Sequence, residues 1–399
     1  MLAQSKYLVK VEAGENNNKF YRMTPDGDSF TVEYGRIGNS GTQTMTYNIG
    51  EWDRIYKSKI KKGYIDNTHL VSEVVIDGKV KSKYLEIDNT SIAEIVKRLQ
   101  VLAKQAIADN YTISSNKVTK QMIDEAQSIL NSMQVSSVEE FNEKLLNLFR
   151  AIPRKMARVS DNLAKTKDDF SKIVQKEQDL LDTMKGQVVQ QSIVEENDGQ
   201  EDDRKTILDA LGIEFSDINQ KDELLIREQL GSIRDRFHKA WVVTNKKTQK
   251  VFDKYVSENK IKNKKLLWHG SRNENWWSIV NTGLLLRPNA VITGKMFGDG
   301  IYFAPKAKKS LGYTSINGSY WVKGNSSSAF MSLYDSAYGI PYDVYFHSNG
   351  VGSFNYDRLQ KTMSGANCLH AHEGQLLRND EIVFYKEEQV TIKYLVELT

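Results

Sequence analysis

The sequence feature that most constrains the fold is the segment 266–313, in which two short apolar runs each adjoin glycine. Leu266-Leu267-Trp268 leads into His269-Gly270, and Gly298-Asp299-Gly300 leads into Ile301-Tyr302-Phe303. Short apolar runs bounded by glycine are typical of buried strands. Because Gly270 has no Cβ, a ligand can approach its backbone N–H and C=O closely. We therefore expect two strands that place a backbone cradle beside His269 and Tyr302.

A hydroxyl and an aromatic ring follow in the run Ser310-Leu311-Gly312-Tyr313. Each piece alone has an ordinary explanation: a histidine before a turn glycine, a hairpin, or tyrosines in a core. Together they indicate a cleft for a nucleotide. His269 offers one donor and one acceptor, which suits a ribose hydroxyl. Ser310 and Tyr313 suit a flat heterocycle that carries polar groups at its edge.

In this order and spacing, residues 266–313 resemble the catalytic domain of the poly(ADP-ribose) polymerases. The resemblance implies a diphtheria-toxin-like ADP-ribosyltransferase fold, with a split antiparallel sheet that binds NAD⁺ as a substrate. It implies that His269 and Tyr302 are the first two members of a His-Tyr-Glu triad, with His269 on the adenosine ribose. It also implies that the nicotinamide end is held by Gly270, Ser271, Ser310 and Tyr313.

The third triad position departs from the family pattern. The run Leu376-Leu377-Arg378-Asn379-Asp380-Glu381 puts Asp380 where an ungapped comparison expects glutamate. Neighbouring side chains on a strand point to opposite faces, so only one of these two acids can face the cleft. We expect Asp380 there as the catalytic carboxylate, near the positive charge that develops on the ribose. A one-residue bulge that presents Glu381 is the alternative. The shorter aspartate leaves polymer synthesis and single-unit transfer both open.

Other nucleotide sites and most metal sites are disfavoured by the sequence. No Gly-x-Gly-x-x-Gly follows an expected strand, and no Lys-Ser/Thr follows the glycines at 294–300, which disfavours dinucleotide-binding and P-loop folds. The single cysteine, Cys368, excludes disulfide frameworks and cysteine-rich zinc sites. Cys368, His370 and His372 are too few and wrongly spaced for a closed zinc site, so we expect no metal.

The chain of 399 residues has a net charge of only +4. Nucleic-acid binding therefore needs a local patch rather than a bulk positive charge. No apolar run of about 18 residues is present, which predicts no membrane span. The N-terminus lacks the pattern of a signal peptide. We expect a nuclear protein if the source is eukaryotic and a cytoplasmic one otherwise.

Residues 1–88 predict a small sheet followed by a helix at 51–62, with strands near 7–12, 20–23, 30–37 and 45–47. With Tyr34-Gly35-Arg36 on a strand, this order resembles the WGR domain, whose tryptophan is replaced by Tyr34. The resemblance implies binding to DNA strand breaks. The candidate DNA-binding residues are Tyr34, Gly35, Arg36, Lys57 and Lys61. A lysine-rich helix face that only meets solvent is the alternative.

Residues 89–194 predict a helical bundle, with helices near 91–106, 119–134, 137–152 and 159–189 and a break at Lys185-Gly186. Its position resembles the family's regulatory helical domain, which implies autoinhibition relieved by DNA. A bundle without chemistry is the alternative. Residues 195–218 predict an acidic linker. Residues 219–399 predict the transferase domain, which opens with a helix at 222–242 and contains strands near 330–333, 343–346 and 390–398.

The fold expected is therefore α+β and multidomain: a β-sheet-plus-helix module, an all-α bundle and a split-sheet transferase. Three functions remain open at this point. The first is an NAD⁺-dependent ADP-ribosyltransferase, stimulated by DNA breaks, that modifies proteins including itself. The second is a DNA-end-binding scaffold with an inert transferase domain. The third is a mono-ADP-ribosyltransferase that acts on a nucleic-acid end.

Overall fold

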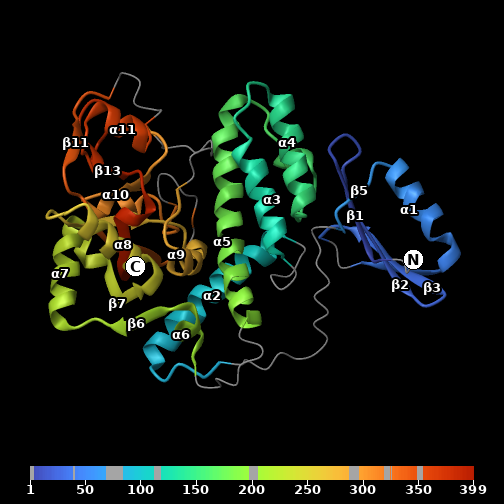
Figure 1. Cartoon of the computed structure of the whole chain (residues 1–399), viewed down its shortest axis with the longest axis horizontal. Coiled ribbons are helices and arrows are strands. Elements are labelled where there is room, and N and C mark those ends of the chain that lie inside the picture. The colour runs from blue at the N-terminus through green and yellow to red at the C-terminus, as the bar shows by residue number, and fades with distance from the viewer. Residues whose placement is uncertain are drawn as a thin grey trace. The chain divides into compact units, whose positions relative to one another are not determined.

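The protein is represented by a computed structural model that describes residues 4–38, 41–68, 84–111, 118–196, 205–286, 296–318, 324, 326–347 and 354–399 (Figure 1). The chain forms two compact units. The first consists mainly of residues 1–79 and 104–188, and the second of residues 80–103, 189–288 and 294–399. Of the expected acidic linker 195–218, residues 197–204 lie outside the described residues, whereas residues 207–217 contain a short helix and a strand.

The first unit begins with a five-stranded antiparallel sheet in the order β4-β3-β2-β1-β5. Helix α1 (Trp52–Lys61) covers it, and the ring of Trp52 meets that of Phe30 edge-on at 4.9 Å. The strands and helix expected in residues 1–88 are confirmed. The two-residue β5 was not expected, because so short a strand leaves no alternation in the sequence. The strands are β1 (Lys6–Glu12), β2 (Asn17–Asp26), β3 (Ser29–Arg36), β4 (Gln43–Asn48) and β5 (Ile65–Asp66).

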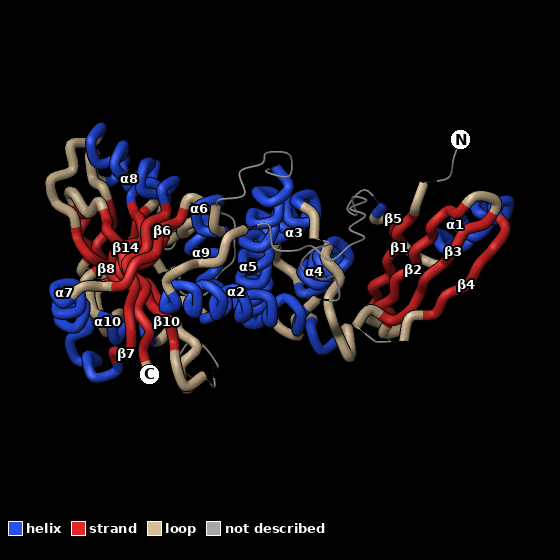
Figure 2. The backbone as a smooth tube through the Cα atoms, turned by 90° about the horizontal axis from the view of Figure 1, so that it is seen from below, coloured by secondary structure: helices blue, strands red, loops and turns tan. Residues whose placement is uncertain are grey.

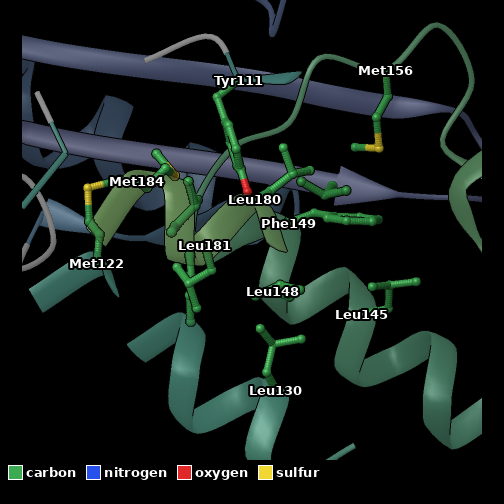
Figure 3. Close-up of a cluster of buried hydrophobic side chains, with 14 of the residues drawn as sticks. Tyr111, Met122, Leu130, Leu145, Leu148, Phe149, Met156, Leu180, Leu181 and Met184 are labelled. Atoms are coloured by element: carbon green, nitrogen blue, oxygen red, sulfur yellow. The ribbon is translucent and has the colours of Figure 1, made fainter. Parts of the chain in front are cut away.

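The helical part of the first unit is built around an apolar cluster (Figure 3). Side chains from three helices meet there, among them Leu130, Leu148 and Leu181. The N-caps follow the sequence: Thr119 accepts from the N–H of Met122, and Ser137 accepts from that of Glu140. The helices are α2 (Thr90–Asn110), α3 (Lys120–Asn131), α4 (Val138–Ala151) and α5 (Phe170–Glu196).

Two expectations about α5 were wrong. The helix starts at Phe170 rather than near 159, and it continues through Gly186. A glycine inside a helix costs only about 1 kcal/mol relative to alanine. The burial of Val174, Leu181 and Met184 on one side of α5 outweighs that cost.

The second unit contains two sheets, and Figure 2 labels the strands of the larger one. The larger is antiparallel, in the order β6-β7-β14-β10-β8, and the smaller is β11-β12-β13-β9, in which only β11 and β12 run parallel. The strands are β6 (Ile213–Asp217), β7 (Phe237–Asn245), β8 (Lys265–Gly270), β9 (Ile301–Phe303), β10 (Ala329–Ser336), β11 (Pro341–Val344), β12 (Cys368–Ala371), β13 (Glu381–Phe384) and β14 (Val390–Leu398). The helices are α6 (Ile207–Leu211), α7 (Gln220–Leu230), α8 (Lys246–Glu258), α9 (Trp276–Thr282), α10 (Ala307–Leu311) and α11 (Tyr356–Thr362).

The prediction of a helix at 222–242 was wrong for the second half of that range. Helix α7 ends at Leu230, Gly231 has a φ of +53°, and β7 begins at Phe237. Side chains on both faces of β7 are buried, with Trp241 in one core cluster and Ala240 in another. A strand that is buried on both faces does not alternate apolar with polar residues. Its apolar run therefore resembles that of a buried helix, which is what the sequence predicted.

The first half of α2 packs within the second unit. Ile92, Ile95 and Leu99 share a core cluster with residues of the large sheet. At the edge of this contact, Arg98 Nη1 lies 2.5 Å from Glu397 Oε1 on β14, and Arg98 also donates to Ser328. None of the described helices is long and apolar enough to cross a membrane.

Candidate active site

The site is framed where β8 of the large sheet meets β9 of the small one. Trp268 and Ala304 exchange two backbone hydrogen bonds of 2.9 and 3.0 Å. Next to this bridge, His269 Nδ1 lies 3.0 Å from the carbonyl oxygen of Tyr302. The first two residues of the expected triad are therefore neighbours.

The imidazole of His269 is held neutral. Its burial lowers the pKa to about 4, and the hydrogen bond to the Tyr302 carbonyl opposes this only in part. A carbonyl oxygen can only accept, so Nδ1 carries the proton and Nε2 keeps a lone pair. His269 can therefore accept a hydrogen bond from a hydroxyl group.

The phenol of Tyr302 is fixed by two backbone groups. Its oxygen accepts from the N–H of Phe297 and its hydroxyl donates to the carbonyl of Gly298, each at 2.9 Å. Burial raises the pKa of Tyr302 far above its usual value, and burial also raises that of Tyr313 to about 12. Both phenols stay neutral, so their rings can contact a flat ligand without adding charge.

Gly270 and Ser310 approach each other so closely that only glycine fits at 270. A Cβ at that position would lie 2.0 Å from the carbonyl oxygen of Ser310. The Ser310 hydroxyl donates to the carbonyl of Trp268 at 3.1 Å. The hydroxyl of Ser271 accepts from Asn275 Nδ2 at 3.0 Å, in the loop that follows β8. Of the residues expected at the nicotinamide end, Gly270 ends β8 and Ser271 follows it, whereas Ser310 lies on α10 and Tyr313 follows that helix.

The acid that shares a face with Tyr302 is Glu381, not Asp380. Strand β13 pairs with β9 so that Val383 lies opposite Tyr302. Directly paired residues point to the same side of a sheet, and so do residues two apart on one strand. Glu381 therefore faces the side of Tyr302, and Asp380 faces away. The expected placement of Asp380 is corrected on this point. No bulge is required, because β13 pairs with β9 and β12 without a register shift.

The Glu381 carboxylate is buried, and only one of its two oxygens has a partner among the described residues. Lys309 Nζ lies 2.6 Å from Oε1, and the two side chains are only 14% and 8% exposed. The second oxygen, Oε2, is buried and has no hydrogen-bond partner among the described residues. After burial, the charge of Glu381 is a further cause of the raised pKa values of Tyr302 and Tyr313. A buried acceptor left open beside two tyrosines suits a ligand hydroxyl.

Asp380 has both carboxylate oxygens engaged elsewhere. Oδ1 accepts from the N–H of Glu373 at 2.8 Å, and Oδ2 lies 3.1 Å from His370 Nε2. Burial alone would raise the pKa of Asp380, but the hydrogen bonds from Glu373 and His370 lower it overall. Asp380 is thus an ionised acceptor that is already satisfied within the protein.

Sequence reasoning missed Lys309. Besides Glu381, its ammonium group donates to the carbonyl of Asn379 at 3.1 Å. Burial lowers the pKa of Lys309, although the adjacent Glu381 opposes the shift. The only sequence signal is its position directly before Ser310 on a short helix, which does not indicate a buried partner.

The candidate DNA-binding residues lie in two different environments. Lys57 and Lys61 are exposed on α1. Tyr34 lies 5.6 Å from the ring of Tyr21 and lies beneath Lys59. Gly35 lies on the same strand, and a Cβ there would meet the carbonyl of Gly41 at 3.3 Å.

Arg36 is engaged inside the first unit. Its guanidinium donates to the carbonyl oxygens of Asn16 at 2.7 Å and Ala157 at 2.8 Å, and to that of Met156 at 3.3 Å. A guanidinium used in this way connects β3 to the segment after α4, and fewer of its donors remain for a phosphate.

Comparison with known families gives two matches, each to a stretch of the chain. Residues 214–337 match the poly(ADP-ribose) polymerase catalytic domain, and residues 4–70 match the WGR domain. The catalytic-domain match ends before β13, so it does not decide between Asp380 and Glu381.

Two similar proteins come from invertebrate iridescent virus 6. The chain is 38% identical over 178 residues to uncharacterized protein 101L, covering 43% of this chain and 73% of that protein. It is 32% identical over 178 residues to the putative poly [ADP-ribose] polymerase-like protein 100L, covering 44% and 92%. Poly [ADP-ribose] polymerase 1 of Danio rerio is 24% identical over 315 residues, covering 75% of this chain but only 31% of that larger protein.

Proposed function

Because the chain belongs to the poly(ADP-ribose) polymerase family and is an NAD⁺ ADP-ribosyltransferase, we propose that residues 219–399 transfer ADP-ribose to protein side chains, its own included. In this proposal His269 accepts a hydrogen bond from the adenosine ribose. Gly270, Ser310 and Tyr313 hold the nicotinamide, with Ser271 beside them.

The observation that carries the proposal is the open oxygen of Glu381. As the nicotinamide–ribose bond of NAD⁺ breaks, positive charge develops on the ribose. Glu381 Oε2 is buried without a partner among the described residues, and it lies on the side of Tyr302. An anion fixed in a low-dielectric site stabilises such charge strongly. Lys309 at 2.6 Å holds the carboxylate in position, so little reorganisation accompanies the reaction.

Glu381 also bears on the length of the product. The expectation of a shortened acid rested on Asp380, whereas Glu381 has the full side chain that the family uses at this position. We infer that the protein extends chains of ADP-ribose rather than stopping at one unit. Of the alternatives, an inert scaffold and a transferase for nucleic-acid ends have no specific observation in their favour.

Regulation by DNA breaks is part of the same proposal. Tyr34 and Gly35 on β3, with Lys57 and Lys61 on α1, are proposed to contact the DNA end, and the WGR match supports nucleic-acid binding. Helix α2 supports autoinhibition, because its first half packs on the transferase sheet and its second half belongs to the other unit. Loosening the bundle would then alter the transferase through one continuous helix.

The test is incubation of the full chain with labelled NAD⁺, with and without nicked DNA. We expect a ladder of products that nicked DNA intensifies. Glu381→Gln should lower kcat by about 100-fold or more. Asp380→Asn should lower kcat by less than about tenfold. If Asp380→Asn abolishes transfer while Glu381→Gln spares it, the assignment of the acid is wrong. If the wild-type chain incorporates no label, the proposed reaction itself fails.

A further inference from the structure

A second polar cluster lies on the opposite face of the small sheet from Glu381. Asp343 on β11 is paired with His370 on β12, and His372 follows the end of β12. His372 Nε2 lies 2.7 Å from Asp343 Oδ1, and His370 Nδ1 lies 3.8 Å from the same oxygen. One ligand atom from each of these three residues lies within 4.8 Å of the other two.

The spacing of these atoms is close to that of a tetrahedral metal site. With bonds of roughly 2.1 Å to nitrogen and oxygen, neighbouring ligand atoms are about 3.4 Å apart. The observed 2.7 and 3.8 Å fall on either side of this value. The side chain of Asp343 is 41% exposed and that of His372 is 23% exposed, so small rotations can adjust both. An exposed ligand also leaves an entry path for an ion.

His370 is already oriented as a metal ligand would be. Its Nε2 lies 3.1 Å from Asp380 Oδ2, and the other oxygen of Asp380 is held by the N–H of Glu373. This carboxylate fixes the proton on Nε2, so the lone pair lies on Nδ1 and accepts a hydrogen bond from the hydroxyl of Tyr338 at 2.7 Å. An ion bound at Nδ1 would replace that hydrogen bond. Metal-bound histidines typically donate their second N–H to a carboxylate in this way.

We propose that Asp343, His370 and His372 bind a divalent transition-metal ion of the zinc class, with Asp380 as the residue that orients His370. Two imidazoles and one carboxylate suit zinc and its neighbours rather than magnesium or calcium, which prefer oxygen ligands. Three protein ligands leave a fourth position for water. Asp380, which orients His370, directly precedes Glu381 at the start of β13.

The proposed site departs from the expectation that no metal binds, which the structure does not test. The sequence grouped the two histidines with Cys368, whose sulfur is fully buried and lies 3.4 Å from the carbonyl of Tyr338. The third ligand comes instead from Asp343, which only the pairing of β11 with β12 brings close. The proposal does not depend on the transferase mechanism.

The test is calorimetric titration of the untagged full chain with Zn²⁺, together with visible spectroscopy of added Co²⁺. We expect one ion per chain and a Co²⁺ spectrum of a four-coordinate site. His372→Ala and Asp343→Asn should each weaken binding by at least about tenfold, and Asp380→Asn should weaken it by about tenfold without changing the stoichiometry. His238→Ala removes an exposed histidine outside the cluster and should bind as the wild type does.

Circular dichroism and thermal melting without metal check that each variant is folded. His372→Gln keeps the side-chain bulk and replaces His372→Ala if the latter unfolds. The absence of saturable Zn²⁺ binding overturns the proposal. So does wild-type affinity in both His372→Ala and Asp343→Asn, because the ion then binds elsewhere.

Discussion

One residue of register decides which of two adjacent acids lies on the same face of the small sheet as Tyr302. Asp380 and Glu381 are adjacent acids on opposite faces of the small sheet. The hydrogen bonds of Asp380 make it part of the framework, whereas Glu381 keeps one oxygen open. The chemistry of the site thus depends on how two neighbouring carboxylates are satisfied.

The lowered pKa of the partly buried His269 should make NAD⁺ binding insensitive to pH in the range where histidines usually titrate. Its pKa of about 4 lies below the ordinary value of about 6.5. We expect kcat/KM to show no ionisation of His269 between pH 5 and 8. The measurement is the pH profile of kcat/KM for the wild type and His269→Gln. An acidic limb near pH 6.5 that His269→Gln removes would contradict the assignment.

The same shift predicts a loss of stability in acid. Because the folded pKa is lower, the unfolded chain binds the proton more readily between pH 6.5 and 4. The contribution of neutral His269 to the free energy of unfolding is therefore complete above about pH 6.5. It decreases as the pH falls toward 4. At pH 5 the loss is roughly 2 kcal/mol. Urea unfolding at pH 7.5 and pH 5 should show a smaller decline for His269→Gln than for the wild type, and equal declines would refute this.

Gly270→Ala should damage substrate binding more than an ordinary added methyl group does. The new Cβ would lie 2.0 Å from the Ser310 carbonyl, a backbone atom that cannot move without shifting α10. We expect a cost of about 1–3 kcal/mol in stability and a raised KM for NAD⁺. Gly374→Ala is the control in the same unit, because its nearest atoms are at 3.8 Å. Equal KM values and melting temperatures in the two variants would show that the backbone of Ser310 moves to accommodate the added methyl group.

At the scale of secondary structure, α5 is tied to the segment after α4 by a buried ion pair. Arg154 Nη2 lies 3.3 Å from Glu177 Oε1, and the two side chains are only 3% and 5% exposed. Arg154 Nε and Nη1 have no partner among the described residues, although the guanidinium lies over the ring of Tyr111. Burial raises the pKa of Glu177, against the opposing effect of Arg154. Such a pair specifies how α5 docks more than it stabilises the bundle.

Glu177→Ala should therefore destabilise the first unit by about 3–5 kcal/mol, because it leaves Arg154 charged and unpaired in the core. The double variant Arg154→Met with Glu177→Met should recover much of the loss. Glu140→Gln, which breaks a partly exposed pair with Lys144 in the same unit, should cost less than about 1 kcal/mol. The measurement is chemical unfolding followed by a probe in residues 118–186. A single variant as stable as the wild type would mean that water reaches the pair.

How much of this could be predicted depended on whether the signal was local. The motifs that place His269, Gly270 and Ser310 are short local patterns, and so are those that predicted helices near 119–134 and 137–152. The side of the sheet to which Glu381 points depends on how β13 pairs with β9, a strand that is distant in the sequence. The contact of Lys309 with Glu381 depends on the same pairing. Strand β7 was missed for a different reason, because burial on both faces removes the alternation that identifies a strand.

For the whole molecule, the central question is how the N-terminal sheet communicates with the helices of its own unit. Arg36 provides the most direct connection, through the carbonyls of Met156 and Ala157. Two further contacts join the same regions: Arg150 donates to the carbonyl of Val11, and Asn67 donates to that of Arg150. Sheet and bundle therefore share hydrogen bonds across one core rather than forming separate modules.

This connection predicts that DNA binding and DNA stimulation can be separated by mutation. Arg36→Ala removes the bonds to the helical segment, so hydrogen exchange across residues 118–186 should rise without DNA. Stimulation of transfer by nicked DNA should shrink severalfold, because the bundle is already loosened. Lys57→Ala is the matched control on the exposed face of α1: it should weaken DNA binding and reduce its salt dependence, while exchange in the bundle stays at the wild-type level. Unchanged exchange in Arg36→Ala, together with lost DNA affinity, would mean that Arg36 serves the nucleic acid and that the sheet communicates with the helices by another route.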